Sequence, residues 1–268
     1  GIGASTNRIV RNSIRSNSQA GIYLNNEGVD GNRIDDNDVR GHQTGVYIFS
    51  GDGNTITNSR IIRNTQNGVI ITGPATLNRV VGSLISSNLI SGIRLDGSPQ
   101  VRDNRFVRNI LSGGGSNGVQ VNFGTNNTFL NNVIYRHSTV GVRINSGSVL
   151  SNRFINNVLM SNGAVGVTNA GSGTRWEYND VFGHGRNYAN STALAVSNGN
   201  FAGNPEFTNT ASGIFGLRSN SPCVDAGITN ALTALDATPI VGIARDVGAF
   251  ESPFGAASNR FFVNDVNT

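Results

Sequence analysis

Residues 32–48, NRIDDNDVRGHQTGVYI, hold one complete copy of a pattern that recurs about every 24 residues and decides the fold. Each copy opens on Asn, continues through two short apolar phrases, and closes on Gly followed by alternating apolar residues. The closing glycines lie 23 to 26 residues apart, at Gly21, Gly45, Gly68, Gly92, Gly118, Gly141 and Gly166. A repeat this regular is typical of one supersecondary unit stacked on copies of itself.

Aligning the copies gives three columns of apolar residues, each flanked by polar ones. The first column holds Ile9, Ile34, Ile56, Val80, Phe106, Phe129, Phe154 and Trp176. β-Branched and aromatic residues between polar neighbours indicate a strand with one buried face. The middle and closing phrases alternate in the same way, whereas Gly and Asn interrupt every possible helical stretch. Each copy therefore predicts three short strands.

Stacking these copies predicts an all-β fold, a parallel β-helix of about eight coils with three short strands each. Every strand would pair in parallel with its counterparts in the neighbouring coils, about 4.8 Å away. We expect the solenoid to cover residues 1–200 as one body. Because a solenoid end exposes unpaired sheet edges, we also expect the repeat to be N-terminally incomplete and to extend before residue 1.

Asparagine recurs at the turns between the predicted strands. One column holds Asn12, Asn37, Asn109, Asn132 and Asn157, and another holds Asn17, Asn64, Asn88 and Asn162. We expect these residues to adopt the left-handed αL conformation at tight corners and to form hydrogen-bonded ladders. The three histidines share the second column, so we interpret them as replacements for a ladder Asn, with a base or metal ligand as the alternative. They are His42, His137 and His184.

The positive charge of the chain is carried by arginine alone. All 20 basic residues are Arg, the net charge is +4, and the lack of Lys excludes a lysine nucleophile or Schiff base. The slot after each opening Asn should face outward and holds Arg8, Arg33, Thr55, Arg79, Arg105, Thr128, Arg153 and Arg175. This column is either a solvated ladder or a stripe for an acidic glycan or acidic protein surface. Nucleic acid is disfavoured because no aromatic residues interleave with it.

The last part of the chain is not repetitive and contains three phrases that resemble those of a known family. They are Asn204-Pro205-Glu206-Phe207, SPCVDAG over residues 221–227 and DVGAFE over residues 246–251. Secreted bacterial right-handed parallel β-helix repeat proteins, which are similar to pectate lyases, end with phrases of this kind. The resemblance implies a right-handed solenoid, a C-terminal cap over 201–252, and an extracellular or cell-surface location. Residues 253–268 would then form a linker or the start of a following module.

The outward face of the closing strands is the candidate functional site. Stacked aromatic residues suit sugar faces, so we assign glycan binding to Tyr23, Tyr47, Phe49, Arg94 and Gln120. In the enzymes that the chain resembles, substrate lies along such a face, and catalysis would then fall to Arg94, Asp96 and Arg143. A hydrolase would need a second carboxylate facing Asp96, and Asp103 is the one that could approach from a neighbouring turn.

Three functions fit this pattern. The first is a structural or interaction module of a larger extracellular protein, adhesin-like or assembly-forming, because no column is broken by an isolated reactive residue. Its partners would be other modules of the same chain, subunits of an assembly, or an acidic polysaccharide. The alternatives are a polysaccharide lyase or epimerase acting on acidic glycans, and a non-catalytic glycan-binding module.

Cofactor and membrane signals are weak. No metal site or cofactor is expected, although the acidic run Asp30, Asp35, Asp36 and Asp38 could reach a Ca²⁺ ion instead of capping its own turns. No apolar run approaches the roughly 18 residues of a membrane span. The single cysteine, Cys223, excludes an internal disulfide and is expected to be buried.

Overall fold

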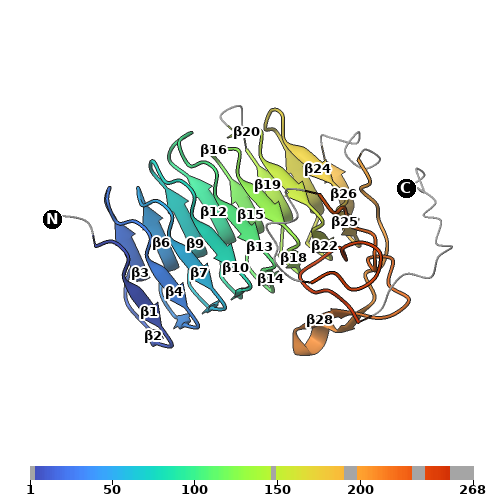
Figure 1. Cartoon of the computed structure of the whole chain (residues 1–268), viewed down its shortest axis with the longest axis horizontal. Helices are drawn as coiled ribbons and strands as arrows, with labels where there is room; N and C mark the ends of the chain where they lie inside the picture. The colour runs from blue at the N-terminus through green and yellow to red at the C-terminus, as the bar shows by residue number, and fades with distance from the viewer. Residues whose placement is uncertain (1–3, 146–148, 190–197, 231–238, 254–268) are drawn as a thin grey trace.

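The computed structural model describes residues 4–145, 149–189, 198–230 and 239–253. Its body is a stack of coils in which each coil gives one strand to each of three parallel sheets (Figure 1). Sheet A contains β1 (Arg8–Val10), β4 (Arg33–Asp35), β7 (Thr55–Thr57), β10 (Arg79–Val81), β13 (Arg105–Val107), β17 (Thr128–Leu130), β21 (Arg153–Ile155) and β24 (Arg175–Glu177). The predicted all-β parallel β-helix with three strands per coil is confirmed.

The other two long sheets follow the same order along the chain. Sheet B contains β2 (Ser13–Arg15), β5 (Asp38–Arg40), β8 (Arg60–Ile62), β11 (Leu84–Ser86), β14 (Ile110–Ser112), β18 (Val133–Tyr135), β22 (Val158–Met160) and β25 (Asp180–Phe182). Sheet C contains β3 (Ala20–Asn25), β6 (Thr44–Phe49), β9 (Asn67–Thr72), β12 (Ser91–Asp96), β15 (Asn117–Val121), β19 (Val140–Ile144), β23 (Val165–Asn169) and β26 (Arg186–Ala189). A small additional sheet pairs β16 (Gly124–Thr125) with β20 (Val149–Leu150).

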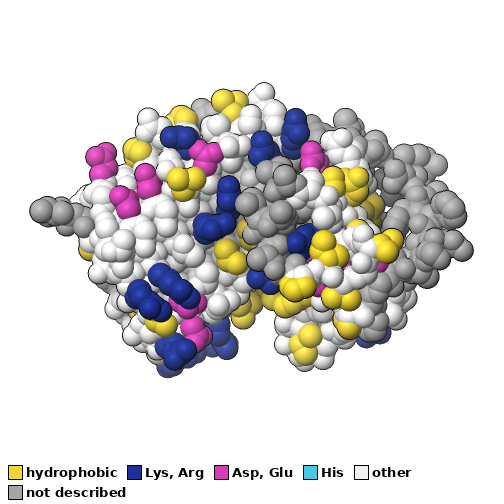
Figure 2. Space-filling view, viewed as in Figure 1, with side chains coloured by type: hydrophobic (Ala, Val, Ile, Leu, Met, Phe, Trp, Pro, Cys, Tyr) yellow, Lys and Arg dark blue, Asp and Glu magenta, His cyan; other side chains and the backbone are white. Residues whose placement is uncertain are grey.

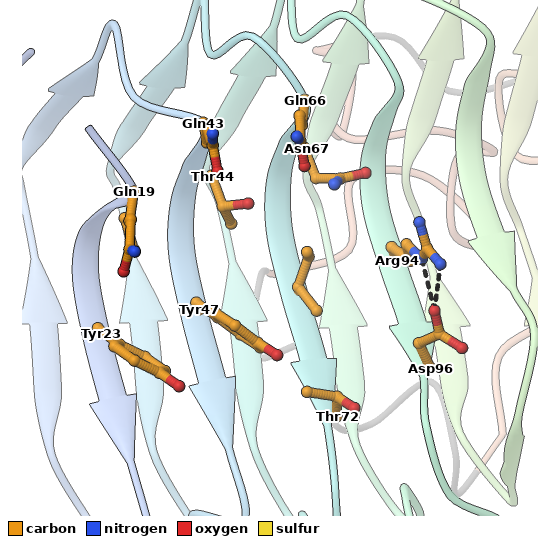
Figure 3. A pocket seen from close by; sticks show the side chains of 12 residues that line it. Gln19, Tyr23, Gln43, Thr44, Tyr47, Gln66, Asn67, Thr72, Arg94 and Asp96 are labelled. Carbon is orange, nitrogen blue, oxygen red and sulfur yellow. Dashed lines mark hydrogen bonds and ion pairs between the residues drawn. The ribbon is translucent and has the colours of Figure 1, made fainter. Parts of the chain in front are cut away.

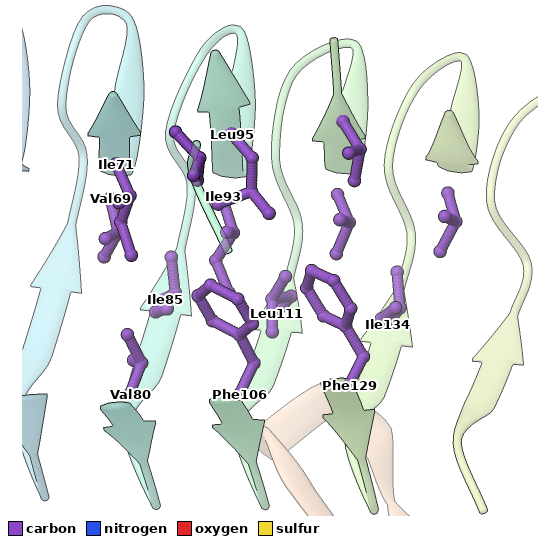
Figure 4. Packing of buried hydrophobic residues seen from close by; sticks show 14 of the residues in the cluster. Val69, Ile71, Val80, Ile85, Ile93, Leu95, Phe106, Leu111, Phe129 and Ile134 are labelled. Carbon is purple, nitrogen blue, oxygen red and sulfur yellow. The ribbon is translucent and has the colours of Figure 1, made fainter. Parts of the chain in front are cut away.

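The core is a column of apolar side chains enclosed by the three sheets (Figure 4). Phe106, Phe129, Phe154 and Trp176 stack face to face at centroid distances of 4.3–4.6 Å. The closing glycines are required by this close stacking, since a Cβ on Gly68 would lie 2.6 Å from the carbonyl oxygen of Gly92 in the next coil. The repeat therefore fixes which residues of neighbouring coils pair. Equivalent apolar side chains stack on one another only when the coils are aligned in that register.

Asparagine ladders run along the corners, as predicted. In one of them the side-chain oxygen of Asn132 accepts from the backbone N–H of Asn109 at 2.9 Å, and its amide donates to Asn157 at 2.9 Å. The expected αL conformation of these asparagines is wrong. The residue before each ladder position takes the positive φ instead, for example Arg108 at 53° and Asn131 at 53°. The αL residue turns the chain, which leaves the following Asn side chain pointing inward to bond the next coil.

All three histidines occupy positions in the ladder of Asn17, Asn64, Asn88 and Asn162, as the alignment predicted. His42 Nδ1 accepts from the Asn17 N–H at 2.9 Å, and His184 Nδ1 accepts from the Asn162 N–H at 2.9 Å. Burial lowers the pKa of His137 to about 4 and also lowers the pKa of His184, so both rings are neutral at pH 7. Gly114 fills the ladder position before His137, because a Cβ there would lie 2.6 Å from the His137 ring. His42 and His184 are structural ladder members through their rings, whereas His137 takes part through its backbone N–H, which donates to the side-chain oxygen of Asn162 at 3.0 Å.

The C-terminal segment runs back along the outside of the coils (Figure 1, orange to red). Its hairpin of β27 (Phe207–Asn209), the 3-10 turn η2 (Thr210–Ser212) and β28 (Ile214–Leu217) contributes Phe207, Phe215 and Leu217 to a second apolar cluster. That cluster packs on the outer face of sheet B, against Val133 and Val158. The outer column of sheet B is polar in its first coils and apolar from Leu84 to Val158, which matches this coverage. The linker or following module was expected over residues 253–268. Of these, residues 254–268 lie outside the described residues.

A buried carboxyl group joins this segment to the last coil. Asp180 is fully buried, and its oxygens accept from the Gly203 N–H at 2.9 Å and from Cys223 Sγ at 3.3 Å. Cys223 is buried, as expected. Loss of solvation raises the pKa of Asp180 from 3.8 to about 8, which keeps the carboxyl largely protonated at neutral pH.

Asp180→Asn is expected to flatten the pH dependence of stability. Between pH 3.8 and about 8 the native state holds a proton that the unfolded chain has released, so native stability falls as pH rises through this window. The neutral amide does not titrate, so the variant should gain most over the native protein above about pH 8. Melting temperature measured against pH tests this, and a native protein that becomes more stable between pH 5 and pH 8 would contradict it.

Within the described residues, no helix is long and apolar enough to cross a membrane.

Candidate functional site

A groove of about 390 Å³ crosses the outer face of sheet C over β3, β6, β9 and β12 (Figure 3). It is lined by Gln19, Ala20, Tyr23, Gln43, Thr44, Tyr47, Gln66, Asn67, Ile70, Thr72, Arg94 and Asp96. Alternate residues of a strand face opposite sides of the sheet. The apolar residues at every second position of these four strands therefore face the core, and the residues between them line the groove. The strand register then brings the groove residues of successive coils into rows.

Two of these rows hold the predicted site residues. Tyr23, Tyr47, Ile70, Arg94, Gln120, Arg143 and Thr168 follow one another in register, and beside them run Asn25, Phe49, Thr72 and Asp96. The structure thus places every predicted residue on one face of one sheet. It separates them along that face, since Arg143 lies two strands beyond Arg94, or about 10 Å.

The aromatic end of the groove is a stacked tyrosine pair. The rings of Tyr23 and Tyr47 lie 4.9 Å apart with an interplanar angle of 13°, and the side of the pair toward solvent is open because Tyr23 is 47% exposed. Partial burial is the main cause that raises the pKa of Tyr47, with Tyr23 and Asp96 adding to it and Arg94 opposing it. Stacking covers the facing sides of the two rings, which leaves their edges, their hydroxyls and the outer face of Tyr23 for a ligand, and Tyr47 keeps its hydroxyl proton. Phe49 lies beside this pair in the next row and is 37% exposed.

The charged end of the groove is an ion pair within one strand. Arg94 Nε donates to Asp96 Oδ2 at 2.8 Å, and a second guanidinium nitrogen contacts the same oxygen (Figure 3). The two groups are about one quarter to one third exposed, and their charges cancel within the groove. Asp96 is the one carboxylate among the described residues that line the groove, and Asp103 is instead paired with Arg102 at 2.9 Å and contacts Asn126. The pair of carboxylates that a hydrolase requires is not formed by these residues.

Gln120 and Arg143 lie beyond the groove on the same face. Gln120 accepts from Ser91 at 3.1 Å and donates to Asn122 at 3.0 Å, while Arg143 Nε donates to Asn117 at 3.1 Å. These bonds hold both side chains along the sheet surface. Arg143 has no carboxylate partner among the described residues, so it offers a positive charge on the extension of the groove.

The sequence analysis missed a row of amide groups along the groove. Gln19, Gln43 and Gln66 occupy the same position in three consecutive coils, and Thr44 and Asn67 follow them on β6 and β9 (Figure 3). The recurrence of Gln just before the closing strand was visible in the sequence. The row was not predicted, because each Gln precedes its closing strand and the alternation of inward and outward side chains begins only within the strand.

The acidic run near the N-terminus is engaged by protein groups. Asp35 bonds Thr57 at 2.6 Å and Arg33 at 2.8 Å, and these partners lower its pKa, the Thr57 hydroxyl most. Asp38 pairs with Arg40 at 2.8 Å, and Asp30 accepts from a backbone N–H of the next coil. No group of three or more His, Cys, Asp or Glu with the spacing of a metal site occurs within the described residues.

Comparison with solved structures finds the same fold in polysaccharide-modifying proteins. The crystal structure of the periplasmic alginate epimerase AlgG is 16% identical with a TM-score of 0.57, over 68% of this chain and 46% of that one. The crystal structure of pectate lyase Pel9A is 18% identical with a TM-score of 0.54, over 90% of this chain and 69% of that one. The chain thus spans less than half the length of the epimerase.

Among curated proteins, no sequence matches this chain. Residues 2–159 match the family described as the right handed beta helix region, which takes in more than half of the chain. The handedness expected from the C-terminal phrases is confirmed by this match. The chain belongs to the right-handed β-helix family.

Proposed function

We propose that this chain is a non-catalytic interaction module that binds a glycan in the sheet C groove. The observation that carries the proposal is the exposed Tyr23–Tyr47 stack, which forms one end of a groove otherwise lined by amides, hydroxyls and a neutralised ion pair. Stacked aromatic faces suit the apolar faces of sugar rings, and amide side chains both donate and accept, as sugar hydroxyls require. The groove combines these two features.

The direction of the groove fits a polymer lying along the solenoid axis. Its lining residues come from four neighbouring strands, which span about 14 Å at 4.8 Å per strand. The face continues past the groove to Gln120 and Arg143, so a longer chain would meet a further amide and an uncompensated positive charge. An acidic sugar in that part of the ligand would be favoured over a neutral one.

The module belongs, in this proposal, to a larger protein outside the cytoplasm, where it acts in adhesion or assembly. The similarity to a protein described as a periplasmic epimerase supports an extracellular or periplasmic location. The uniform columns of the solenoid support a rigid scaffold that presents its face to a partner.

Tyr47→Ala is expected to weaken glycan binding at least tenfold. The substitution removes one of the two rings of the stack, and a stacked aromatic contact is typically worth about 0.5–1.5 kcal/mol beyond the apolar area that it buries. Leu89→Ala is the control, since Leu89 is 62% exposed and does not line the groove. Affinity electrophoresis and calorimetry against a panel of neutral and uronate polysaccharides measure the effect. Equal affinity of native protein and Tyr47→Ala for a bound polymer would refute the groove as its site.

A polysaccharide lyase or epimerase is the second candidate function. It is favoured by the similarity to an alginate epimerase and a pectate lyase, and by Arg94, Asp96 and Arg143 lying on one face. The Arg94–Asp96 ion pair speaks against it, because the Asp96 oxygen that would take a proton is already occupied by the guanidinium of Arg94. Incubation with uronate polymers separates the two functions. Release of unsaturated products, or epimerised residues, that Arg94→Ala abolishes would establish the enzyme instead of the binding module.

A further inference from the structure

The outer face of sheet A carries a patterned column of arginines that the groove does not use. In register along the sheet, the first residue of each strand reads Arg8, Arg33, Thr55, Arg79, Arg105, Thr128, Arg153 and Arg175. The column therefore consists of three arginine pairs separated by single threonines. Beyond Arg105 the face is covered in part, because Thr128 is only 5% exposed and Val107, Leu130 and Ile155 beside the column are buried with Ile228 of the C-terminal segment. Corresponding members of successive pairs lie three strands apart, about 14 Å, and the whole column spans about 34 Å.

These paired arginines face one another at the spacing of adjacent strands, which is unfavourable for like charges. In the outer pairs part of the charge is offset, since Arg33 contacts Asp35 at 2.8 Å and Arg175 contacts Glu177 at 3.8 Å. In the central pair it is not, because neither Arg79 nor Arg105 has a carboxylate partner among the described residues. The Arg79 side chain is exposed and that of Arg105 is half-buried. The middle of this face therefore carries two neighbouring positive charges, Arg79 and Arg105, with no carboxylate partner among the described residues.

We propose that the part of this face from Arg8 to Arg105 is a second binding surface, which takes an anionic polysaccharide lying along the solenoid axis. Sulfate or carboxylate groups of the polymer would be held between the guanidinium forks of each pair, where they relieve the repulsion between neighbours. Arginine side chains lie along the length of the solenoid on the face seen in Figure 2. The surface is separate from the groove, which lies on sheet C.

The spacing of charge favours a polysaccharide over nucleic acid. Duplex DNA carries one charge per about 1.7 Å, so the roughly 19 Å from Arg8 to Arg105 would meet about 11 phosphates with only four arginines. No aromatic residue stands in the column to stack on single-stranded bases. The straight, regular row also matches a linear polymer with spaced charges better than the irregular surface of a folded acidic protein.

The experiment measures binding of the whole chain to heparin, a sulfated polysaccharide, and to polygalacturonate, a carboxylated one, at low and physiological salt. Replacing both central arginines, Arg79→Gln with Arg105→Gln, should lower affinity for one or both polymers roughly tenfold. Loss of a like-charge contact should leave the melting temperature unchanged or higher, so the variant remains folded. Thr55→Arg, which closes the first gap, should raise affinity a few fold.

The control removes the same net charge elsewhere, by Arg60→Gln with Arg63→Gln, two exposed residues on the sheet B side. A loss confined to the sheet A variant, together with native affinity of Tyr47→Ala for the same polymer, supports a second site. Equal losses in the two double variants would show a general charge effect and overturn the proposal. Unchanged affinity of the sheet A variant would overturn it as well, and so would tighter binding of duplex DNA or polyglutamate than of either polysaccharide.

Discussion

Phe129→Ala is expected to lower the free energy of unfolding by about 3–5 kcal/mol, the range for truncating a buried Phe. Phe129 is 1% exposed and lies between Phe106 at 4.5 Å and Phe154 at 4.6 Å, so the variant loses two ring stacks as well as buried area. The sheets on either side hold the coil spacing fixed. The cavity therefore cannot close by moving the neighbouring coils together.

Urea unfolding followed by the fluorescence of Trp176 measures this effect, because Trp176 is the only tryptophan and stacks on Phe154 at 4.3 Å. Phe49→Ala is the control, since Phe49 lies on the outer face of sheet C and is 37% exposed. Its substitution should cost less than about 1 kcal/mol. Similar losses in the two variants would mean that the aromatic column does not dominate the stability of the solenoid.

Asn132→Ala is expected to cost about as much as the loss of the core ring, although it removes only one polar side chain. Asn132 is 1% exposed and makes bonds in both directions along the ladder, including 2.9 Å bonds from the Asn109 N–H and to the Phe106 carbonyl. Each buried polar group left without a partner costs about 1–3 kcal/mol. With two such groups, a loss of about 2–6 kcal/mol follows.

Asn132→Ser should restore part of this loss, because serine already fills the same ladder in two coils. There Ser59 and Ser83 accept from the N–H of the preceding coil at 3.2 Å. Hydrogen exchange of the Asn109 amide gives a local readout and should be fast in Asn132→Ala and slower in Asn132→Ser. Native protection of that amide in Asn132→Ala would contradict the role of the ladder. A serine variant no more stable than the alanine variant would contradict the partial rescue.

Much of the fold could be predicted because each coil repeats the same sequence pattern and therefore forms the same three strands. The strands, their parallel register, the ladder role of His42 and the outward column from Arg8 to Arg175 all follow from aligning the copies. The conformation of the corners could not be predicted from composition. Asn was expected in the αL region, but its side chain is needed inside the ladder, so residues such as Arg108 and Asn131 take the positive φ in its place.

The candidate site was predicted in part. Alternation along the closing strand placed Tyr23, Tyr47, Arg94 and Asp96 on one face, and the structure shows them lining one groove. The Gln19–Gln43–Gln66 row was missed because its members precede the strand, where the rule of alternation does not yet apply. That Arg94 binds Asp96 within its own strand also needed coordinates, since the alternation along the strand shows only that both side chains face outward.

The sequence by itself determined the solenoid, because stacking copies buries every apolar column and bonds every ladder position at once. It also determined which residues face outward, since a strand alternates its side chains. Only the tertiary structure decided how the non-repetitive segment covers sheet B through Phe215 and Leu217, and how Asp180 becomes buried beneath it. Those contacts join residues far apart in the chain that no repeat relates. They depend on surface complementarity in three dimensions, which local periodicity does not encode.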